Sequence, residues 1–336
     1  MQRACWALPG NEKMSLSNEV HVIFGAGPVG RSLAKELSTR GKIVRLINRS
    51  GKLPMIPGLD ALAGVEIAAG NAADLDSTRL LCAGADVVYN CTNPPYTRWP
   101  ELFPALQAGV LAGAASTGAK LIVMENLYMY GPTGGQPLRE DLPYAAKTRK
   151  GITRARMAEE LLEAHARGKV RAAAGRAADF FGPGVLDSAL GERIFATALE
   201  GKPAQVVGNA DLPHTYTYIR DVARALTILG ERDEALGKAW HLPSPETVST
   251  RQIVELIETE IGRKVRLQAA PGWLVGLVGL FNPVLREVAE MAYEFEEPFI
   301  LDASCFEEAF GLRATPLAET IHETVQWFQV HQNHKV

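Results

Sequence analysis

Three glycines near the start of the sequence have the spacing of a phosphate-binding turn. Gly25, Gly27 and Gly30 form G-x-G-x-x-G in "VHVIFGAGPVGRSLAKEL", after an apolar run and before an amphipathic one. Glycine at these positions permits a tight turn, close approach of the backbone to a pyrophosphate, and close packing of helix on strand. With Pro28 and Val29 opening the helix, unpaired N–H groups would face the phosphates. The pattern predicts a bound nicotinamide dinucleotide.

The end of the next predicted strand indicates which dinucleotide is bound. NAD sites place Asp or Glu here to accept hydrogen bonds from the ribose 2′-hydroxyl, whereas this sequence has Asn48, Arg49 and Ser50. Arg49 can bind a 2′-phosphate through charge-assisted hydrogen bonds, and Ser50 adds a donor. We therefore expect NADP in preference to NAD, with a solvated surface role for Arg49 as the alternative.

Later strands are followed by further candidate contacts of the cofactor, namely Asp74, Leu75, Asn90 and Asp179. Asp74 either accepts a hydrogen bond from the adenine amino group or caps the helix that begins near Asp76. Asp179 would lie near the nicotinamide, as a proton partner of the substrate or as an acceptor that fixes its loop.

A second set of polar side chains follows a buried strand in "VMENLYMYGP", residues 123–132. Asn126 can orient a carbonyl group by hydrogen bonding, and Tyr128 can donate a proton to one. The sequence therefore places a candidate catalytic loop here.

These motifs resemble the extended and atypical short-chain dehydrogenase/reductases, the NAD-dependent epimerase/dehydratase family. The likeness also rests on "GRAADFFGPGV", "LPHTYTYIRDVARAL" and the terminal "PFILDASCFEEAFGLRATPLAETIHETVQWF", and it covers nearly the whole chain after residue 18. The first turn departs from the family's usual G-x-x-G-x-x-G. The resemblance implies an α/β Rossmann fold, in which helices cover both faces of a doubly wound parallel sheet and a smaller C-terminal lobe binds the substrate.

The resemblance also implies a Ser or Thr on the catalytic loop and a Tyr-x-x-x-Lys pair on the next long helix. Counting along the motifs puts Asn126 at the Ser/Thr position, Ile152 at the tyrosine and Arg156 at the lysine. Ile152 cannot transfer a proton, so the tyrosine must be replaced. Arg156 can serve as a cationic clamp on the ribose, or can be a salt-bridged helix residue.

Two tyrosines are candidates for the missing proton donor. Tyr128 lies on the catalytic loop, and Tyr144 in "YAAKTRKG" precedes the helix together with Lys147 and Lys150. Tyr144 requires its loop to fold back over the site, whereas Tyr128 could equally be a core residue. His214 could face the substrate lobe, but we expect an exposed loop position in preference.

Alternating strand and helix patterns are expected to position these residues. The predicted strands are Val20–Phe24, Ile43–Ile47, Val65–Ala69, Val87–Asn90, Leu121–Met124 and Val170–Ala174, and the predicted helices are Val29–Arg40, Asp76–Leu81, Trp99–Ala112, Gly151–Arg167, Ser188–Glu200 and Thr250–Ile261. We divide the chain into a loose leader at 1–18, a Rossmann domain at 19–180, and a mainly substrate-binding lobe at 181–336 with segments that return to the first domain.

Composition excludes several other classes of protein. The net charge of −3 provides no basic field for nucleic acid. The four cysteines form no CxxC pair, which argues against zinc and favours free thiols in a cytoplasmic protein. The apolar "WLVGLVGLF", residues 273–281, is too short to span a bilayer, and we expect a buried or lid helix.

Together, these observations predict an NADP-dependent oxidoreductase that transfers a hydride to a carbonyl group or conjugated double bond of a small, partly hydrophobic substrate. The alternatives are a nucleotide-sugar epimerase or dehydratase, and a non-catalytic regulator that senses NADP. The resemblance further implies a possible homodimer, formed through the helices near Trp99–Ala112 and Gly151–Arg167.

Overall fold

A seven-stranded parallel sheet forms the centre of the protein. The computed structural model describes residues 19–59 and 62–333, and the predicted leader at 1–18 lies outside them. The strand order is β11-β6-β5-β4-β1-β2-β3. The strands are β1 (Val20–Phe24), β2 (Ile43–Asn48), β3 (Val65–Ala69), β4 (Val87–Asn90), β5 (Lys120–Glu125), β6 (Arg171–Arg176) and β11 (Ala239–His241). The order reverses between β1 and β4, where doubly wound folds bind their ligands.

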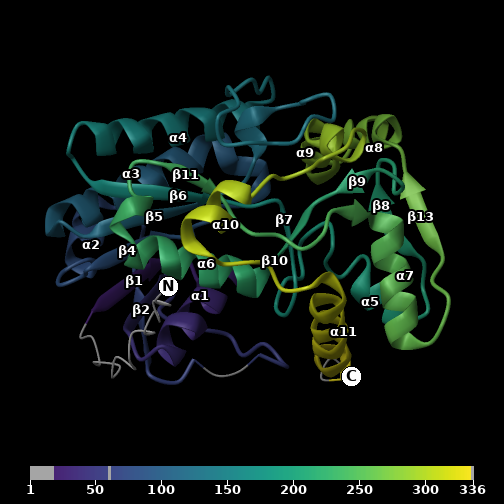
Figure 1. Cartoon of the computed structure of the whole chain (residues 1–336), viewed down its shortest axis with the longest axis horizontal. Coiled ribbons are helices and arrows are strands. Elements are labelled where there is room, and N and C mark those ends of the chain that lie inside the picture. Colours follow the sequence, from purple (N-terminus) through teal and green to yellow (C-terminus); the bar gives the residue numbers. More distant parts are fainter. Residues whose placement is uncertain (1–18, 60–61, 334–336) are drawn as a thin grey trace, which may run out of the picture.

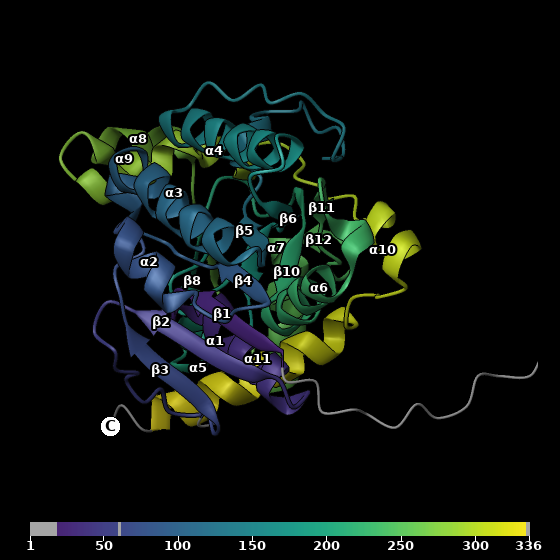
Figure 2. The same ribbon diagram turned by 90° about the vertical axis from the view of Figure 1, so that its left-hand side faces the viewer.

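Helices cover both faces of this sheet, as Figure 2 shows. One face packs against α1 (Pro28–Thr39) and α6 (Ile219–Glu231), and the other against α2 (Leu75–Leu81), α3 (Trp99–Thr117) and α4 (Arg149–Ala166). Strand residues alternate between the two cores: Ile23 packs toward α1, whereas its neighbours Val22 and Phe24 pack toward α3. Burial on both faces explains the continuous apolar runs, and the predicted Rossmann fold is confirmed.

A second lobe is built mainly from the C-terminal half and lies to the right in Figure 1. It contains three short strand pairs and several helices: β7 (Asp179–Phe181) with β10 (Tyr216–Tyr218), β8 (Ala204–Val207) with β13 (Leu267–Ala270), β9 (Pro213–His214) with β12 (Val248–Ser249), α5 (Phe195–Leu199), α7 (Thr250–Ile261), α8 (Gly272–Gly279), α9 (Pro283–Glu290) and α11 (Leu317–Asn333). Two later segments return to the first domain. Helix α6 packs on α1, and β11 pairs with β6. Helix α10 (Ser304–Phe310) packs against β11. The domain boundary at residue 180 stays a prediction.

One prediction in this lobe was wrong. The expected helix over 188–200 is helical only at Phe195–Leu199, because turns occupy the preceding residues. The apolar segment 273–281 forms α8 and the turn after it, as expected, but several of its large side chains are exposed: Trp273 is 72% exposed and Phe281 is 88% exposed. Its role as a lid stays a prediction. The periodicity of apolar residues could not reveal which side chains of this segment are exposed, since nearly every residue in it is apolar. No helix in the described part of the chain combines the length and the apolar composition needed to span a bilayer.

Candidate active site

The glycine turn has the geometry of a dinucleotide site. Gly25 has a φ of +106°, and a Cβ at this residue would collide with the carbonyl oxygen of Cys91. A Cβ at Gly30 would collide with the carbonyl oxygen of Gly25, whereas one at Gly27 would meet no atom within 4 Å. No side chain caps the N-terminus of α1, which Pro28 and Val29 open. The residues fit a pyrophosphate, because the open space at Gly27 faces amide groups without a side-chain partner.

Asn48 shapes the turn that follows β2. Its Oδ1 accepts hydrogen bonds from the backbone N–H of Ser50 at 3.0 Å and of Gly51 at 2.7 Å. The side chains of Arg49 and Ser50 are exposed at the surface. Asn48 therefore fixes a turn from which Arg49 and Ser50 extend into solvent, and a contact of either residue with a cofactor stays a prediction.

Asp74 and Asn90 also hold local turns. Asp74 Oδ1 accepts hydrogen bonds from the backbone N–H groups of Asp76 and Ser77, each at 3.0 Å. Asp74 therefore caps α2, which was one of the two roles expected for it. Leu75, the first residue of α2, is 48% exposed. Asn90 is buried, and its Oδ1 accepts from the backbone N–H of Thr92 at 3.1 Å. Contacts of these residues with a cofactor remain predictions.

A cavity of about 180 Å³ lies beyond the carboxyl ends of β4, β5 and β6. It is lined by Asn93, Tyr96, Trp99, Asn126, Leu127, Tyr128, Ala177, Ala178, Asp179, Phe180, Asp187, Ser188, Glu294 and Phe299. The structure thus brings together three of the predicted residues: Asn126, Tyr128 and Asp179. The lining includes three carboxyl groups but no lysine, arginine or histidine.

Asn126 and Tyr128 are held by specific partners in this cavity. Asn126 Oδ1 accepts from Arg154 Nε at 3.3 Å, which leaves the amide Nδ2 as the end able to donate to a substrate. The hydroxyl groups of Tyr128 and Tyr96 are 3.2 Å apart. Burial raises the pKa of the Tyr128 phenol well above its usual value, so this group keeps its proton at neutral pH.

The structure separates the other two predicted catalytic residues from the cavity. Tyr144 lines no part of it, and its hydroxyl accepts a hydrogen bond from Arg176 instead. Arg156 is exposed on α4, and Ile152 is 38% exposed on the same helix. Counting residues along the motifs therefore placed the expected tyrosine and lysine positions on the exposed face of α4.

The buried face of α4 carries Lys150 and Arg154, which are 0% and 1% exposed. They lie four residues apart, as the members of a Tyr-x-x-x-Lys pair do, but two positions before Ile152 and Arg156. The signal in the sequence was the helical spacing of Lys150 and Arg154 with Met157 and Leu161. Sequence analysis considered Lys150 only as a loop residue beside Tyr144 and did not single out Arg154, because buried lysine and arginine are rare.

Lys150 and Arg154 are tied to different surroundings. Lys150 Nζ contacts Glu290 at 2.9 Å and also Glu287, and these two ion pairs fasten α4 to α9. The Arg154 guanidinium lies over the ring of Phe103, 4.7 Å from its centre. Only Arg154 reaches Asn126 directly, so it is the cation that orients the catalytic loop.

A buried ionic network lies beneath the catalytic loop. Glu125 Oε2 accepts from Arg176 Nε at 2.9 Å, and Tyr130 Oη accepts from another nitrogen of Arg176 at 2.6 Å. Tyr130 in turn lies 2.8 Å from His241 Nε2. Burial and the Arg176 charge lower the pKa of His241 to about 3, so this ring is neutral and accepts the tyrosine proton.

His214 is buried, contrary to our expectation of an exposed loop residue. Its side chain is 4% exposed, and its Nε2 lies 2.9 Å from Asp179 Oδ2. The other ring nitrogen, Nδ1, lies 3.1 Å from the backbone carbonyl oxygen of Glu294. Sequence analysis missed this because β9, which carries His214, was not predicted, and Asp179 is 35 residues away in the chain.

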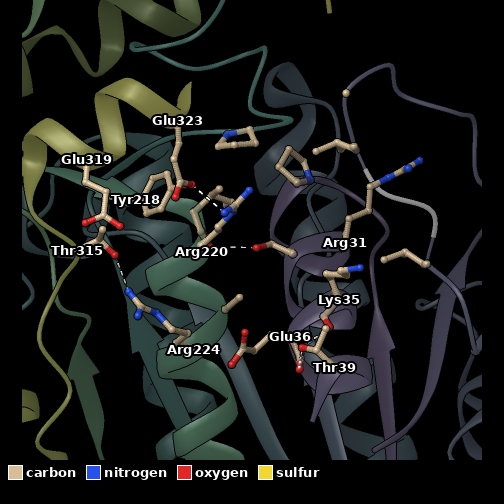
Figure 3. Close-up of a pocket in the computed structure, with 18 residues that line it drawn as sticks. Arg31, Lys35, Glu36, Thr39, Tyr218, Arg220, Arg224, Thr315, Glu319 and Glu323 are labelled. Atoms are coloured by element: carbon tan, nitrogen blue, oxygen red, sulfur yellow. Dashed lines mark hydrogen bonds and ion pairs between the residues drawn. The ribbon is translucent and has the colours of Figure 1, made fainter. Parts of the chain in front are cut away.

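A larger cavity of about 470 Å³ lies elsewhere, between α1, α6 and α11 (Figure 3). Its arginines are engaged: Arg220 pairs with Glu323 at 2.8 Å, Arg224 with Asp221, and Arg31 donates to two backbone carbonyls. It contains none of the candidate catalytic residues, although Pro28, a predicted contact of the cofactor, is among the residues that line it. The described residues contain no group of three or more side chains suited to hold a metal.

Comparison with known proteins identifies relatives of this fold. Residues 21–242 match the model of the NAD dependent epimerase/dehydratase family. No curated protein matches the chain.

Three solved structures with low sequence identity share the fold over nearly the whole chain. The UDP-glucuronic acid 4-epimerase from Bacillus cereus, in complex with NAD, has a TM-score of 0.74 and 16% identity, covering 92% of this chain and 98% of its own. The dTDP-glucose 4,6-dehydratase from Bacillus anthracis, also with NAD, has a TM-score of 0.76 and 14% identity, with 94% and 98% covered. The UDP-N-acetylglucosamine 4-epimerase from Bacillus cereus has a TM-score of 0.72 and 12% identity, with 93% and 96% covered.

Proposed function

Because the chain belongs to the NAD-dependent epimerase/dehydratase family, we propose that it is an oxidoreductase that works with a bound nicotinamide dinucleotide. We further propose that it reduces a carbonyl group or conjugated double bond of a small, partly hydrophobic substrate. The dinucleotide would supply the hydride, and the glycine turn at residues 25–30 would hold its pyrophosphate.

The size and charge of the substrate cavity carry the proposal for a small substrate. A volume of about 180 Å³ is small beside the roughly 300–1,000 Å³ of typical ligand pockets. A nucleotide sugar carries a diphosphate, which would enter a lining that holds Asp179, Asp187 and Glu294 and no cation. Aromatic walls formed by Tyr96 and Trp99 suit an uncharged organic molecule instead.

Within this cavity the side chains of the chain have separate tasks. The Asn126 amide donates a hydrogen bond to the substrate carbonyl oxygen, because its own oxygen is occupied by Arg154. The neutral Tyr128 hydroxyl, linked to Tyr96, provides a second donor on the same loop. Orientation of the carbonyl by these groups lowers the barrier to hydride transfer.

For the cofactor we propose NADP, although two of the solved structures named above, the UDP-glucuronic acid 4-epimerase and the dTDP-glucose 4,6-dehydratase, hold NAD. The turn from Asn48 to Lys52 contains no carboxylate to repel a 2′-phosphate, and Arg49 is exposed at it. Replacing Arg49 with Ala should weaken NADPH binding about tenfold and leave NADH binding within twofold, measured by fluorescence titration. Tighter binding of NADH than NADPH by the unaltered chain would contradict this preference.

The solved relatives favour a second candidate, a nucleotide-sugar epimerase or dehydratase, over reduction of a small carbonyl compound. A screen separates the two functions. The chain would be incubated with NADPH or NADH and a panel of ketones and enones, and the loss of nicotinamide absorbance followed. In parallel, UDP- and dTDP-sugars would be incubated with NAD, and their products separated by chromatography.

Each outcome of this screen has one meaning. Turnover of a ketone or enone supports the proposed reductase, whereas conversion of a nucleotide sugar overturns it in favour of the second candidate. Dinucleotide binding without turnover of any compound would instead favour a regulator that senses NADP.

A further inference from the structure

The family resemblance implies a tyrosine as the proton donor, but α4 has none at its buried face. Two carboxylic acids, Asp179 and Glu294, line the same cavity as Asn126, and His214 lies behind Asp179. We propose that Asp179 and His214 form the proton-exchanging pair of this enzyme, with Asp179 as the group that meets the substrate. His214 is the positioning residue behind it. This inference rests on the proposed reductase function.

The hydrogen bonds of His214 fix the number of protons on its ring. A backbone carbonyl oxygen only accepts, so Nδ1, at 3.1 Å from the carbonyl of Glu294, must carry a proton. Nε2 lies 2.9 Å from Asp179 Oδ2, and this contact needs one more proton between the two atoms. The pair therefore holds two protons, and in the form that we propose His214 is an imidazolium and Asp179 a carboxylate.

Packing holds the His214 ring in place while leaving Asp179 accessible. The ring stacks on Phe295 and Phe299, with centroid distances of 4.7 and 4.9 Å. Aromatic faces attract a cation, so this stacking helps to support the imidazolium form. Asp179 is 23% exposed by its side chain and lines the cavity, so it is the member of the pair that a substrate can reach.

Glu294, which lines the same cavity as Asp179, is kept uncharged. Its side chain is buried, and its Oε1 has no hydrogen-bond partner. Burial, and next the Asp179 charge, raise the pKa of Glu294 well above its usual value. The other ionisable groups near the pair are Tyr96, Tyr128 and Tyr216, all neutral phenols, and the carboxyl group of Asp187, which lines the same cavity. Glu294 is thus a neutral carboxyl group beside Asp179, and the two carboxyl groups have different roles.

The proposed step balances in atoms and charge. A carbonyl group that is reduced gains a hydride at carbon, from the reduced dinucleotide, and a proton at oxygen. The proton shared by Asp179 and His214 passes to that oxygen, which leaves a carboxylate and a neutral imidazole that keeps its Nδ1 proton. Nε2 then takes a proton from water and restores the pair.

The first test measures the pair itself and needs no substrate. Nitrogen NMR of the ¹⁵N-histidine-labelled full chain at neutral pH would be compared for the unaltered chain, Asp179→Asn, and Asp211→Asn. Asp211 is an exposed carboxylate near His214 in sequence that lies outside the cavity, so its variant is the matched control. We expect Nε2 of His214 to be protonated in the unaltered chain and in Asp211→Asn, and to become unprotonated in Asp179→Asn.

The second test uses the carbonyl compound that the screen shows to be turned over. Asp179→Asn should lower kcat about 100-fold or more, and Asp211→Asn should change it by less than twofold. His214→Gln should reduce kcat less than Asp179→Asn does and alter its dependence on pH, because it acts through Asp179. Dinucleotide binding, measured by fluorescence, should stay within twofold in His214→Gln and in Asp211→Asn.

Failure of the proposed proton-exchanging pair can be distinguished from failure of the proposed reductase function. An Nε2 signal that is the same with and without Asp179 overturns the pair, whether or not any substrate is found. Turnover that survives in Asp179→Asn overturns the pair while the reductase function stands. A screen without turnover removes the reductase function, and the nitrogen spectra then decide alone whether the two residues share a proton.

Discussion

The glycine turn and the catalytic loop lie at the same edge of the sheet, yet they are built in different ways. The turn at residues 25–30 is made from backbone, and Gly27 contributes open space. The loop after β5 depends on buried charges, with Arg154 on Asn126 and Arg176 on Glu125. A backbone site is specified by neighbouring residues, whereas a side-chain site requires partners from distant segments. The two regions should therefore respond differently to substitution.

The largest effect is expected at the buried ion pair beneath the catalytic loop. Glu125→Gln leaves Arg176 as an uncompensated buried charge, which should lower the free energy of unfolding by about 3 kcal/mol. The control is Glu163→Gln, whose partner Arg167 is exposed, and it should cost less than about 0.5 kcal/mol. Urea denaturation measures both. Equal losses in the two variants would show that the network does not hold the loop.

A smaller effect, on binding instead of folding, is expected at the glycine turn. Gly27→Asp should weaken dinucleotide binding about 100-fold, because a carboxylate would occupy the space of the pyrophosphate. Its stability to urea should stay close to that of the unaltered chain, since a Cβ there meets no atom within 4 Å. Gly30→Ala is the contrasting variant and should lose stability, because its Cβ would collide with Gly25. Unchanged dinucleotide affinity in Gly27→Asp would place the cofactor elsewhere.

The smallest effect distinguishes the two faces of α4. Arg154→Met should reduce turnover about 10- to 100-fold, because Asn126 loses the donor that orients its amide. Arg156→Met should change turnover by less than twofold, since that residue is exposed. Steady-state kinetics with the compound identified by the screen would measure both. A greater loss in Arg156→Met would restore the role that motif counting gave to this residue.

Local patterns in the sequence were enough to predict the central sheet. The strands β1, β3 and β4 and the helix α7 were predicted with the bounds that the structure gives them. Such patterns depend on residues close together in the chain, as the capping box of Ser249 and Gln252 shows. The exposed apolar side chains of α8 could not be predicted in this way, because a uniformly apolar segment does not indicate which side faces water.

The sequence by itself determined the Rossmann sheet and the turn at Gly25, Gly27 and Gly30, because glycine spacing and apolar runs act over a few residues. Only the tertiary structure decided which side chains share the substrate cavity. The rotation of α4 selects Arg154 over Arg156, and the path of the chain brings His214 onto Asp179. These pairings follow from packing between segments that are distant in the chain. On a helix, two positions that are two residues apart can lie on opposite faces, one buried and one exposed.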